Sequence, residues 1–254
     1  METLHVVKVG GAVVEEPGKL EAFLGSFAAL PGRKVLVHGG GRSATALAAR
    51  LGIETKMAGG RRITDAATLE TVVMVYGGQV NKSIVARLQA LGISAAGVCG
   101  ADFDCIRSVR RPVGEIDYGF VGDIVSVRAE AFSLLLEAGI VPVVAPLTHD
   151  GAGQLLNTNA DAVASAVAAG LSDRYAVSLK LCFEKPGVLA DPADDASVLP
   201  SLSAAEIPSL TASGVLSGGM LPKVKGALDA LEAGVTEVVI TSYSVLSGGT
   251  RVSL

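Results

Sequence analysis

The sequence predicts an α/β fold, a three-layer α/β/α sandwich with a mainly parallel central sheet. Short runs of apolar and β-branched residues alternate along the chain with stretches in which apolar residues recur at helical spacing. Strands separated by helices are joined by right-handed crossovers, which gives a parallel sheet with helices on both faces. The runs at 35–37 and 238–240 are apolar throughout, as expected of strands buried on both sides.

Each element follows from its own pattern. The short apolar runs predict strands at residues 4–9, 34–37, 93–98, 140–144, 175–181, 235–241 and 251–254. Helical spacing predicts helices at residues 20–30, 43–51, 65–91, 132–136, 159–171, from 203, and 221–233. Residues 54–64, with Gly59 and Gly60 at their centre, predict a small hairpin. Residues 104–127 are strand-like but broken by Gly and Pro, which indicates an antiparallel excursion.

Several expected helices begin with a recognisable signal. Ser43, Asp65 and Asn159 are predicted N-caps, and Ser203 and the glutamate three residues later fit the spacing of a capping box. The glycines at 77 and 78 are expected to bend or break the long helix at 65–91. The polar stretch at 191–197 is expected to be an exposed loop.

The composition excludes several classes of protein. Half of the 254 residues are hydrophobic and the net charge is -4, the reverse of a disordered chain. With 21 basic against 25 acidic residues and no Trp, the chain lacks the basic face and stacking platforms of a nucleic-acid binder. Its three cysteines, without a CxxC pair, predict neither a disulfide framework nor a zinc site. No signal peptide or membrane-spanning run is visible, so we expect a cytoplasmic protein.

Two glycine clusters close the first two expected strands. The segment KVGG begins at Lys8, and HGGG begins at His38 and opens a helix. Ligands of open α/β sheets bind beyond the carboxyl ends of strands, where glycine N–H groups and helix N-termini bind anions. Taken alone, the first cluster is better explained by a tight turn with a surface lysine. His38 itself is interpreted as an orienting or packing residue.

The second cluster also matches another pattern. Residues 39–44 fit the G-x-G-x-x-A fingerprint of a dinucleotide site. That fingerprint expects an acidic residue about 20 positions later, at the end of the next strand. Asp65, the nearby acidic residue, is better explained as a helix cap, so a dinucleotide site is the weaker interpretation.

Three further clusters add charge and amide groups. Arg61 and Arg62 lie on the expected hairpin, and the fork of a guanidinium suits bidentate capture of a carboxylate. Asn157 is not needed to cap the following helix, whereas Asp161 is explained by its place in the first turn. Lys223 lies in the first turn of a helix, where the dipole repels a positive charge and a nearby anion would relieve the conflict.

Together these clusters favour one kind of chemistry. They supply two lysines, glycine N–H groups, an arginine, an Asn and an Asp, but no obvious nucleophile, metal cage or histidine base. Phosphoryl transfer needs such a set, because the protein mainly positions the reactants and neutralises charge. An acceptor that is already nucleophilic, such as a carboxylate, fits best.

The clusters resemble, as a set, the amino acid kinase family. The matching segments, in family order, are KVGG at Lys8, HGGG at His38, GRRIT at Gly60, LLNTNAD at Leu155 and GGMLPKV at Gly218. They are most similar to the branch that phosphorylates N-acylated glutamate. The resemblance implies an N-terminal lobe, residues 1–173, for acyl-glutamate binding and dimerisation, and a C-terminal lobe, residues 174–254, for ATP. It implies ATP-dependent phosphorylation of the side-chain carboxylate of N-acetyl-L-glutamate, in arginine biosynthesis.

The resemblance also implies roles for single residues. Lys8 and Lys223 would stabilise the transferring phosphoryl group, and Asp161 would orient both lysines. Gly11 and Gly40 would donate backbone N–H groups to the phosphates. The acyl-glutamate would be held by Gly40, Gly41, Arg62 and Asn157, with the guanidinium gripping a carboxylate. ATP would lie against Glu184, Lys185, Pro186, Gly187, Val188, Leu189, Val215, Leu216 and Ser217. Mg²⁺ would arrive with the nucleotide, keeping waters and phosphate oxygens as its main ligands.

Departures from the family pattern leave alternatives open. The nucleotide turn reads CFEKPGV at 182–188 where the family has a pattern like T/S-D-V-x-G-V, so Glu184 replaces an Asp. A second arginine on the hairpin, together with arginines at 107, 110 and 111, favours the hypothesis of an N-succinyl substrate. A nicotinamide-dependent oxidoreductase and a non-catalytic amino-acid sensor are further hypotheses, but neither explains the retained lysines. Family members that arginine inhibits usually carry an extra N-terminal helix, which links dimers into a hexamer. Here the first strand begins near residue 4, so the resemblance implies an arginine-insensitive homodimer.

Overall fold

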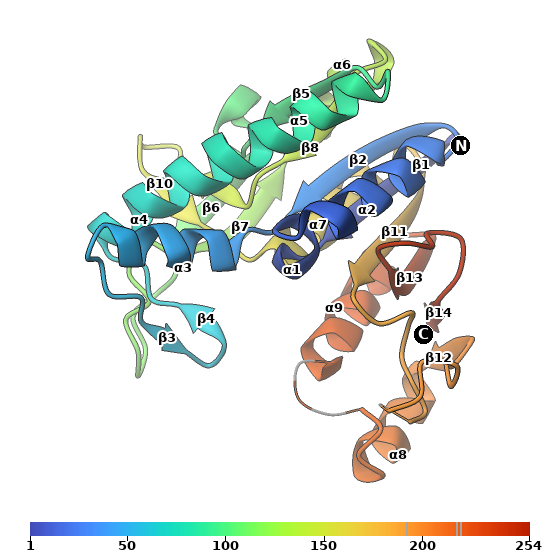
Figure 1. Cartoon of the computed structure of the whole chain (residues 1–254). Coiled ribbons are helices and arrows are strands. Elements are labelled where there is room, and N and C mark those ends of the chain that lie inside the picture. Colours follow the sequence, from blue (N-terminus) through green and yellow to red (C-terminus); the bar gives the residue numbers. More distant parts are fainter. Residues whose placement is uncertain (192, 217, 219) are drawn as a thin grey trace.

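An eight-stranded sheet forms the centre of the molecule (Figure 1). The structure is a computed structural model, which describes residues 1–191, 193–216, 218 and 220–254. The strands of this sheet are β1 (Thr3–Val9), β2 (Arg33–His38), β5 (Ala95–Val98), β8 (Val141–Val144), β11 (Ala176–Phe183), β12 (Ser201–Ser203), β13 (Glu237–Ser242) and β14 (Thr250–Ser253). Their order is β12-β14-β13-β11-β1-β2-β8-β5, and every pair is parallel except β13 with β14. The predicted α/β fold with a mainly parallel sheet is confirmed.

Side chains that follow one another along a strand point to opposite faces of the sheet, and this divides the interior into two cores. Leu4 and Val6 of β1 belong to the core beneath α6 (Ala129–Glu137), α7 (Ala160–Leu171) and α9 (Met220–Glu232). Val7 and Val9 belong to the opposite core, beneath α2 (Pro17–Ala29), α4 (Ala66–Val73) and α5 (Asn81–Ala90). Since Lys8 follows the alternation of Leu4 and Val6, it lies on the face that α7 and α9 cover.

Two smaller sheets lie outside the central one. The four-stranded sheet has the order β10-β9-β6-β7, built from β6 (Ile106–Arg110), β7 (Gly122–Val127), β9 (Leu147–His149) and β10 (Leu155–Asn157). Strands β6 and β7 are antiparallel, which confirms the predicted excursion. The predicted hairpin is present but shorter than expected, with β3 (Met57–Ala58) and β4 (Arg61–Arg62).

Helix ends confirm some of the predictions and correct others. Asp65 and Asn159 are N-caps, and Ser203 and Glu206 form the predicted capping box, which opens a short 3₁₀ turn (Ala204–Glu206) before α8 (Ile207–Ala212). The prediction for Ser43 is wrong. Helix α3 (Gly41–Arg50) begins two residues earlier, with Gly40 as N-cap, because the chain turns into the helix directly from the glycines.

Of the bend or break expected at Gly77 and Gly78, the break does not occur. A π-helix (Met74–Val80) instead joins α4 to α5. Such a segment accommodates an extra residue by i→i+5 hydrogen bonds and does not interrupt the helix. None of the helices in the described ranges is long and apolar enough to cross a bilayer.

Candidate active site

The two predicted glycine turns are in direct contact. Strands β1 and β2 are parallel neighbours, and the Gly39 N–H donates to the Val9 carbonyl at 2.9 Å. A Cβ on Gly39 would lie 2.8 Å from the backbone nitrogen of Gly11, closer than a real side chain can approach. A Cβ on Gly11 would lie 3.3 Å from the nitrogen of Gly40. The turns interlock because both lack side chains.

Hydrogen bonds from polar side chains fix the glycine turn that follows β2. His38 is fully buried; its Nδ1 donates to the Gly39 carbonyl at 2.8 Å and its Nε2 accepts from Asn81 Nδ2 at 3.1 Å. Burial lowers the pKa of His38 to about 4, so the ring is neutral at physiological pH. Glu15 Oε1 accepts from the Ser43 N–H at 2.6 Å and ties the short helix α1 (Gly11–Val14) to α3. The interpretation of His38 as a packing residue is confirmed.

The same topology rules out a dinucleotide fold at this turn. After α3 the chain enters the β3–β4 hairpin, which belongs to a separate two-stranded sheet. The parallel strand that a dinucleotide-binding βαβ unit needs after its first helix is therefore missing at this place. The fingerprint match at 39–44 is coincidental.

Two lysines from distant parts of the chain converge at the end of β1. Lys8 Nζ lies 2.8 Å from Asp161 Oδ1, on the first turn of α7. Lys8 Nζ and Lys223 Nζ lie 4.8 Å and 3.7 Å from the centre of the Phe183 ring, at the end of β11. Both ammonium groups therefore rest on one aromatic ring, an arrangement stabilised by cation–π attraction.

The electrostatics of Lys223 reflect this crowding. Burial lowers its pKa below the usual value, the charge of Lys8 lowers it further, and the carboxylate of Asp161 partly offsets both effects. Two positive charges and one carboxylate leave the site net positive, which favours an anion such as a phosphate.

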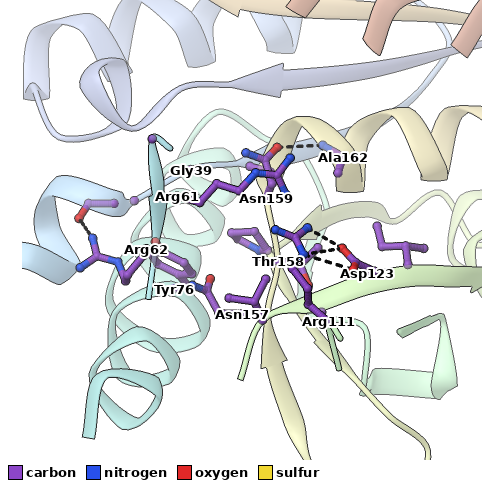
Figure 2. Close-up of a pocket in the computed structure, with 18 of the residues that line it drawn as sticks. Gly39, Arg61, Arg62, Tyr76, Arg111, Asp123, Asn157, Thr158, Asn159 and Ala162 are labelled. Carbon is purple, nitrogen blue, oxygen red and sulfur yellow. Dashed lines mark hydrogen bonds and ion pairs between the residues drawn. The ribbon is translucent and has the colours of Figure 1, made fainter. Parts of the chain in front are cut away.

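A pocket of about 560 Å³ opens beside the glycine turns (Figure 2). It brings together five of the predicted residues: Gly11, Gly40, Gly41, Arg62 and Asn157. Strand β4 positions Arg62, whose Nη2 donates to the Gly41 carbonyl at 2.8 Å and to Thr45 Oγ1 at 2.9 Å. Asn157, at the end of β10, donates to Thr64 Oγ1 at 3.0 Å. Lys8, Asp161 and Lys223 are not among the lining residues; Asp161 lies between two of them, Ala160 and Ala162.

Of the four arginines that favoured the hypothesis of an N-succinyl substrate, two line the pocket and two lie outside it. Arg61 and Arg111 line the pocket, and Arg111 Nε lies 3.2 Å from both carboxylate oxygens of Asp123 (Figure 2). Arg107 is paired with Asp104, and Arg110 donates to the Gly119 carbonyl, so neither is directed into the pocket.

The predicted nucleotide segment has a buried part and an exposed part. Val188, Leu189 and Leu216 are core side chains, so their backbone is what they can offer a ligand. A Cβ on Gly187 would lie 2.7 Å from Thr250 Oγ1, which fixes the turn against β14. Pro186 and Val215 are half-buried, whereas Glu184 and Lys185 are exposed and form the ion pairs with Lys19 and Asp195. Ser217 lies outside the described residues.

Sequence reasoning missed several residues at the site. Phe183 was visible only as part of the nucleotide turn, and no spacing rule links it to two lysines. Tyr76 lies within the helix predicted at 65–91 and belongs to none of the motifs, although it lines the pocket. Asp123 also lines the pocket and lies in no motif, and Thr158 lines it too, although LLNTNAD was noted only for its Asn and Asp residues.

Comparisons with known proteins agree with this geometry. A model of the amino acid kinase family matches residues 3–242. A protein of Bacteroides thetaiotaomicron named acetylglutamate kinase is 57% identical over 253 residues, covering 99% of this chain and 98% of its own. One of Parabacteroides distasonis with the same name is 55% identical, covering 99% of this chain and all of its own. The crystal structure of smu.665 from Streptococcus mutans has a TM-score of 0.82 at 26% identity, covering 98% of both chains. Carbamate kinase from Giardia lamblia shares the fold at 14% identity, with a TM-score of 0.68, covering 99% of this chain and 98% of its own.

Proposed function

Because the chain belongs to the amino acid kinase family, we propose that it transfers the γ-phosphoryl group of ATP to the side-chain carboxylate of N-acetyl-L-glutamate. The product is N-acetyl-L-glutamyl 5-phosphate, and the proposed role is a step of arginine biosynthesis. The name acetylglutamate kinase, shared by relatives more than half identical over almost the whole chain, supports this substrate.

The convergence of Lys8 and Lys223 on Phe183 is the observation that carries the proposed mechanism. As the carboxylate oxygen bonds to the γ-phosphorus, the bond from phosphorus to the β-γ bridging oxygen breaks and its electron pair leaves with ADP. Negative charge spreads over the transferring group, where two ammonium groups stabilise it. A carboxylate is already deprotonated, so the site needs no general base, and the buried neutral His38 is left to its structural role.

The pocket supplies the proposed acyl-glutamate site. Arg62 is held rigidly by three acceptors, Gly41 O, Thr45 Oγ1 and Thr55 Oγ1, so its guanidinium is already positioned for a substrate carboxylate. The backbone N–H groups of Gly11, Gly40 and Gly41 and the amide of Asn157 are the remaining proposed contacts. Asp161 orients Lys8 by its ion pair.

The proposed lobes share the central sheet. Every residue that lines the pocket precedes residue 167, which supports acyl-glutamate binding by residues 1–173. ATP is proposed to bind to residues 174–254, against the turn that follows β11. Asp161 is engaged by Lys8, so Mg²⁺ would take phosphate oxygens and waters as its ligands and would supply further charge neutralisation. We also propose a homodimer, which light scattering tests.

One observation favours a second acyl group. Arg61 lines the pocket, and no carboxylate of the described residues pairs with it, whereas Arg111 is paired with Asp123. An acyl group that ends in a carboxylate, such as succinyl, would give Arg61 a partner. Steady-state kinetics with N-acetyl- and N-succinyl-L-glutamate separate the two substrates, and a clear preference for the acetyl compound removes the second.

Detection of the acyl phosphate tests the function itself. Hydroxylamine traps an acyl phosphate as a hydroxamate, so the purified protein should form hydroxamate when given ATP, Mg²⁺ and N-acetyl-L-glutamate. NAD with a thermal-shift readout serves as the comparison ligand and should not stabilise the protein. ADP formation without hydroxamate, or no reaction with either acyl-glutamate, would reject the proposal.

A further inference from the structure

The π-helix between α4 and α5 is a feature that the reaction described so far leaves unused. Segments of this kind are rare and often occur at functional sites. Tyr76 lies within this segment and Asn81 follows it directly, and both side chains are buried. Asn81 supports the second glycine turn through His38. Tyr76 supports the same turn directly.

The ring of Tyr76 packs against Gly40. A Cβ on Gly40 would lie 3.1 Å from Cδ1 and 3.2 Å from Cε1 of the ring, so the ring occupies the space that a side chain at 40 would need. This close contact with Tyr76 is a physical reason for the glycine at this position.

The hydroxyl of Tyr76 lies in the acyl-glutamate pocket, near Arg62 (Figure 2). A Cβ on Gly41 would lie 3.8 Å from this hydroxyl and 4.0 Å from Arg62 Nη2, which places both polar groups beside Gly41. Burial raises the pKa of Tyr76 more than the nearby Arg62 lowers it, so the hydroxyl keeps its proton. A phenol that keeps its proton can donate a hydrogen bond to an anion.

We propose that Tyr76 is a substrate-binding, specificity-determining residue: its ring fixes Gly40, and its hydroxyl donates to the same acyl-glutamate carboxylate that Arg62 binds. This inference rests on the proposed function. A carboxylate has lone pairs for several donors, so a guanidinium and a phenol at one end of the pocket distinguish a dicarboxylic amino acid derivative from one that lacks that carboxylate.

Tyr76→Phe tests the hydroxyl alone, because the ring remains against Gly40. A hydrogen bond to a charged group contributes enough that KM for N-acetyl-L-glutamate should rise about tenfold or more. The values of kcat and of KM for ATP should stay within about twofold, as expected when an interaction common to ground and transition states is lost. Tyr76→Leu also removes the ring, so kcat should fall as well.

Tyr175→Phe is the matched control. Tyr175 and Tyr76 are both 7% exposed, but the Tyr175 hydroxyl donates to Ser133 Oγ, outside the pocket. This variant should leave both KM values unchanged. The proposal is overturned if Tyr76→Phe behaves like Tyr175→Phe, or if it raises the two KM values equally. Absence of acyl phosphate from the unmodified protein would reject the proposed function instead, and calorimetric binding of N-acetyl-L-glutamate to the same variants would still test Tyr76.

Discussion

The glycine turns after β1 and β2 and the nucleotide turn after β11 lie at neighbouring ends of one sheet, yet different forces hold them. The glycine turns are fixed by backbone contact and by buried hydrogen bonds of His38 and Asn81. The nucleotide turn is anchored at Gly187, but its first residues are held by exposed ion pairs, Glu184 with Lys19 and Lys185 with Asp195. Exposed pairs contribute little stability, whereas close packing tolerates almost no change. The first region is preorganised and the second is adaptable.

The largest effect is expected where the two regions meet, at the lysines. Lys8→Met and Lys223→Met keep an unbranched apolar side chain but remove the charge that we propose stabilises the transferring phosphoryl group. Loss of one such group commonly lowers kcat by about 10²-fold or more, and we expect that loss in each variant. Stopped hydroxamate assays at saturating substrates measure it.

Lys225→Met supplies the control for this comparison. Lys225 lies on the same helix, α9, but is exposed to solvent. Its replacement should leave kcat near the unmodified value. Near-normal turnover in Lys8→Met or Lys223→Met would mean that the charge at that position has no part in phosphoryl transfer.

Gly39→Ala tests the preorganised region by adding a single methyl group. The new Cβ would lie 2.8 Å from the Gly11 nitrogen and 3.4 Å from the Gly11 Cα. Both atoms belong to the backbone and cannot rotate away. Overpacking of this kind costs about 1–3 kcal/mol, so the free energy of unfolding in urea should fall by that amount and kcat should fall with it. Gly25→Ala, on the exposed face of α2 with open space around it, should instead stabilise by about 0.5–1 kcal/mol. Equal stability of the two variants would show that the turns are not interlocked.

The sequence was sufficient to predict these glycine turns because their signal is local. A strand, two or three glycines and a helix follow each other within a few residues, and parallel strands bring such ends to one edge. The same locality explains the correct caps at Asp65 and Asn159. Ser43 was predicted wrongly because a serine two residues into a helix looks like a cap, whereas its N–H is used by Glu15 from a different element.

Long-range contacts account for most of what the sequence could not predict. The contact of Lys8 and Lys223 with Phe183 joins three elements far apart in the chain, and only the resemblance to a family linked the two lysines beforehand. The π-helix was missed since Gly77 and Gly78 normally weaken a helix, and nothing local reveals that packing will keep it continuous. The proposed role of Tyr76 depends on that same π-helix, because Tyr76 lies within it.

The buried His38 gives the preorganised region a dependence on pH. Its pKa is about 4 in the folded protein and near 6.5 when unfolded, so between these values the unfolded chain binds a proton that the folded one does not. The free energy of unfolding therefore falls as pH drops from 6.5 towards 4, by at most about 1.4 kcal/mol per pH unit from this group. His38→Asn, which keeps a donor for the Gly39 carbonyl, should lose this part of the slope. An unchanged slope in urea titrations at several pH values would mean that the fold does not lower the pKa of His38.

The smallest effect is expected in the adaptable region, from Glu184→Gln. Lys19 holds the pKa of Glu184 below its usual value, so the carboxylate is charged at neutral pH, and the amide would end its ion pair with α2. Because Glu184 is exposed and Lys19 is in partial contact with solvent, water and salt already screen the pair, and KM for ATP should change by less than about threefold. Glu16→Gln is the matched control, since Glu16 pairs with the same Lys19 at 2.8 Å but lies three residues before it, outside the nucleotide turn. The comparison would be overturned if KM for ATP rose in Glu184→Gln alone, by as large a factor as kcat falls in Gly39→Ala. The exposed ion pair would then fix the nucleotide turn as firmly as close packing fixes the glycine turns.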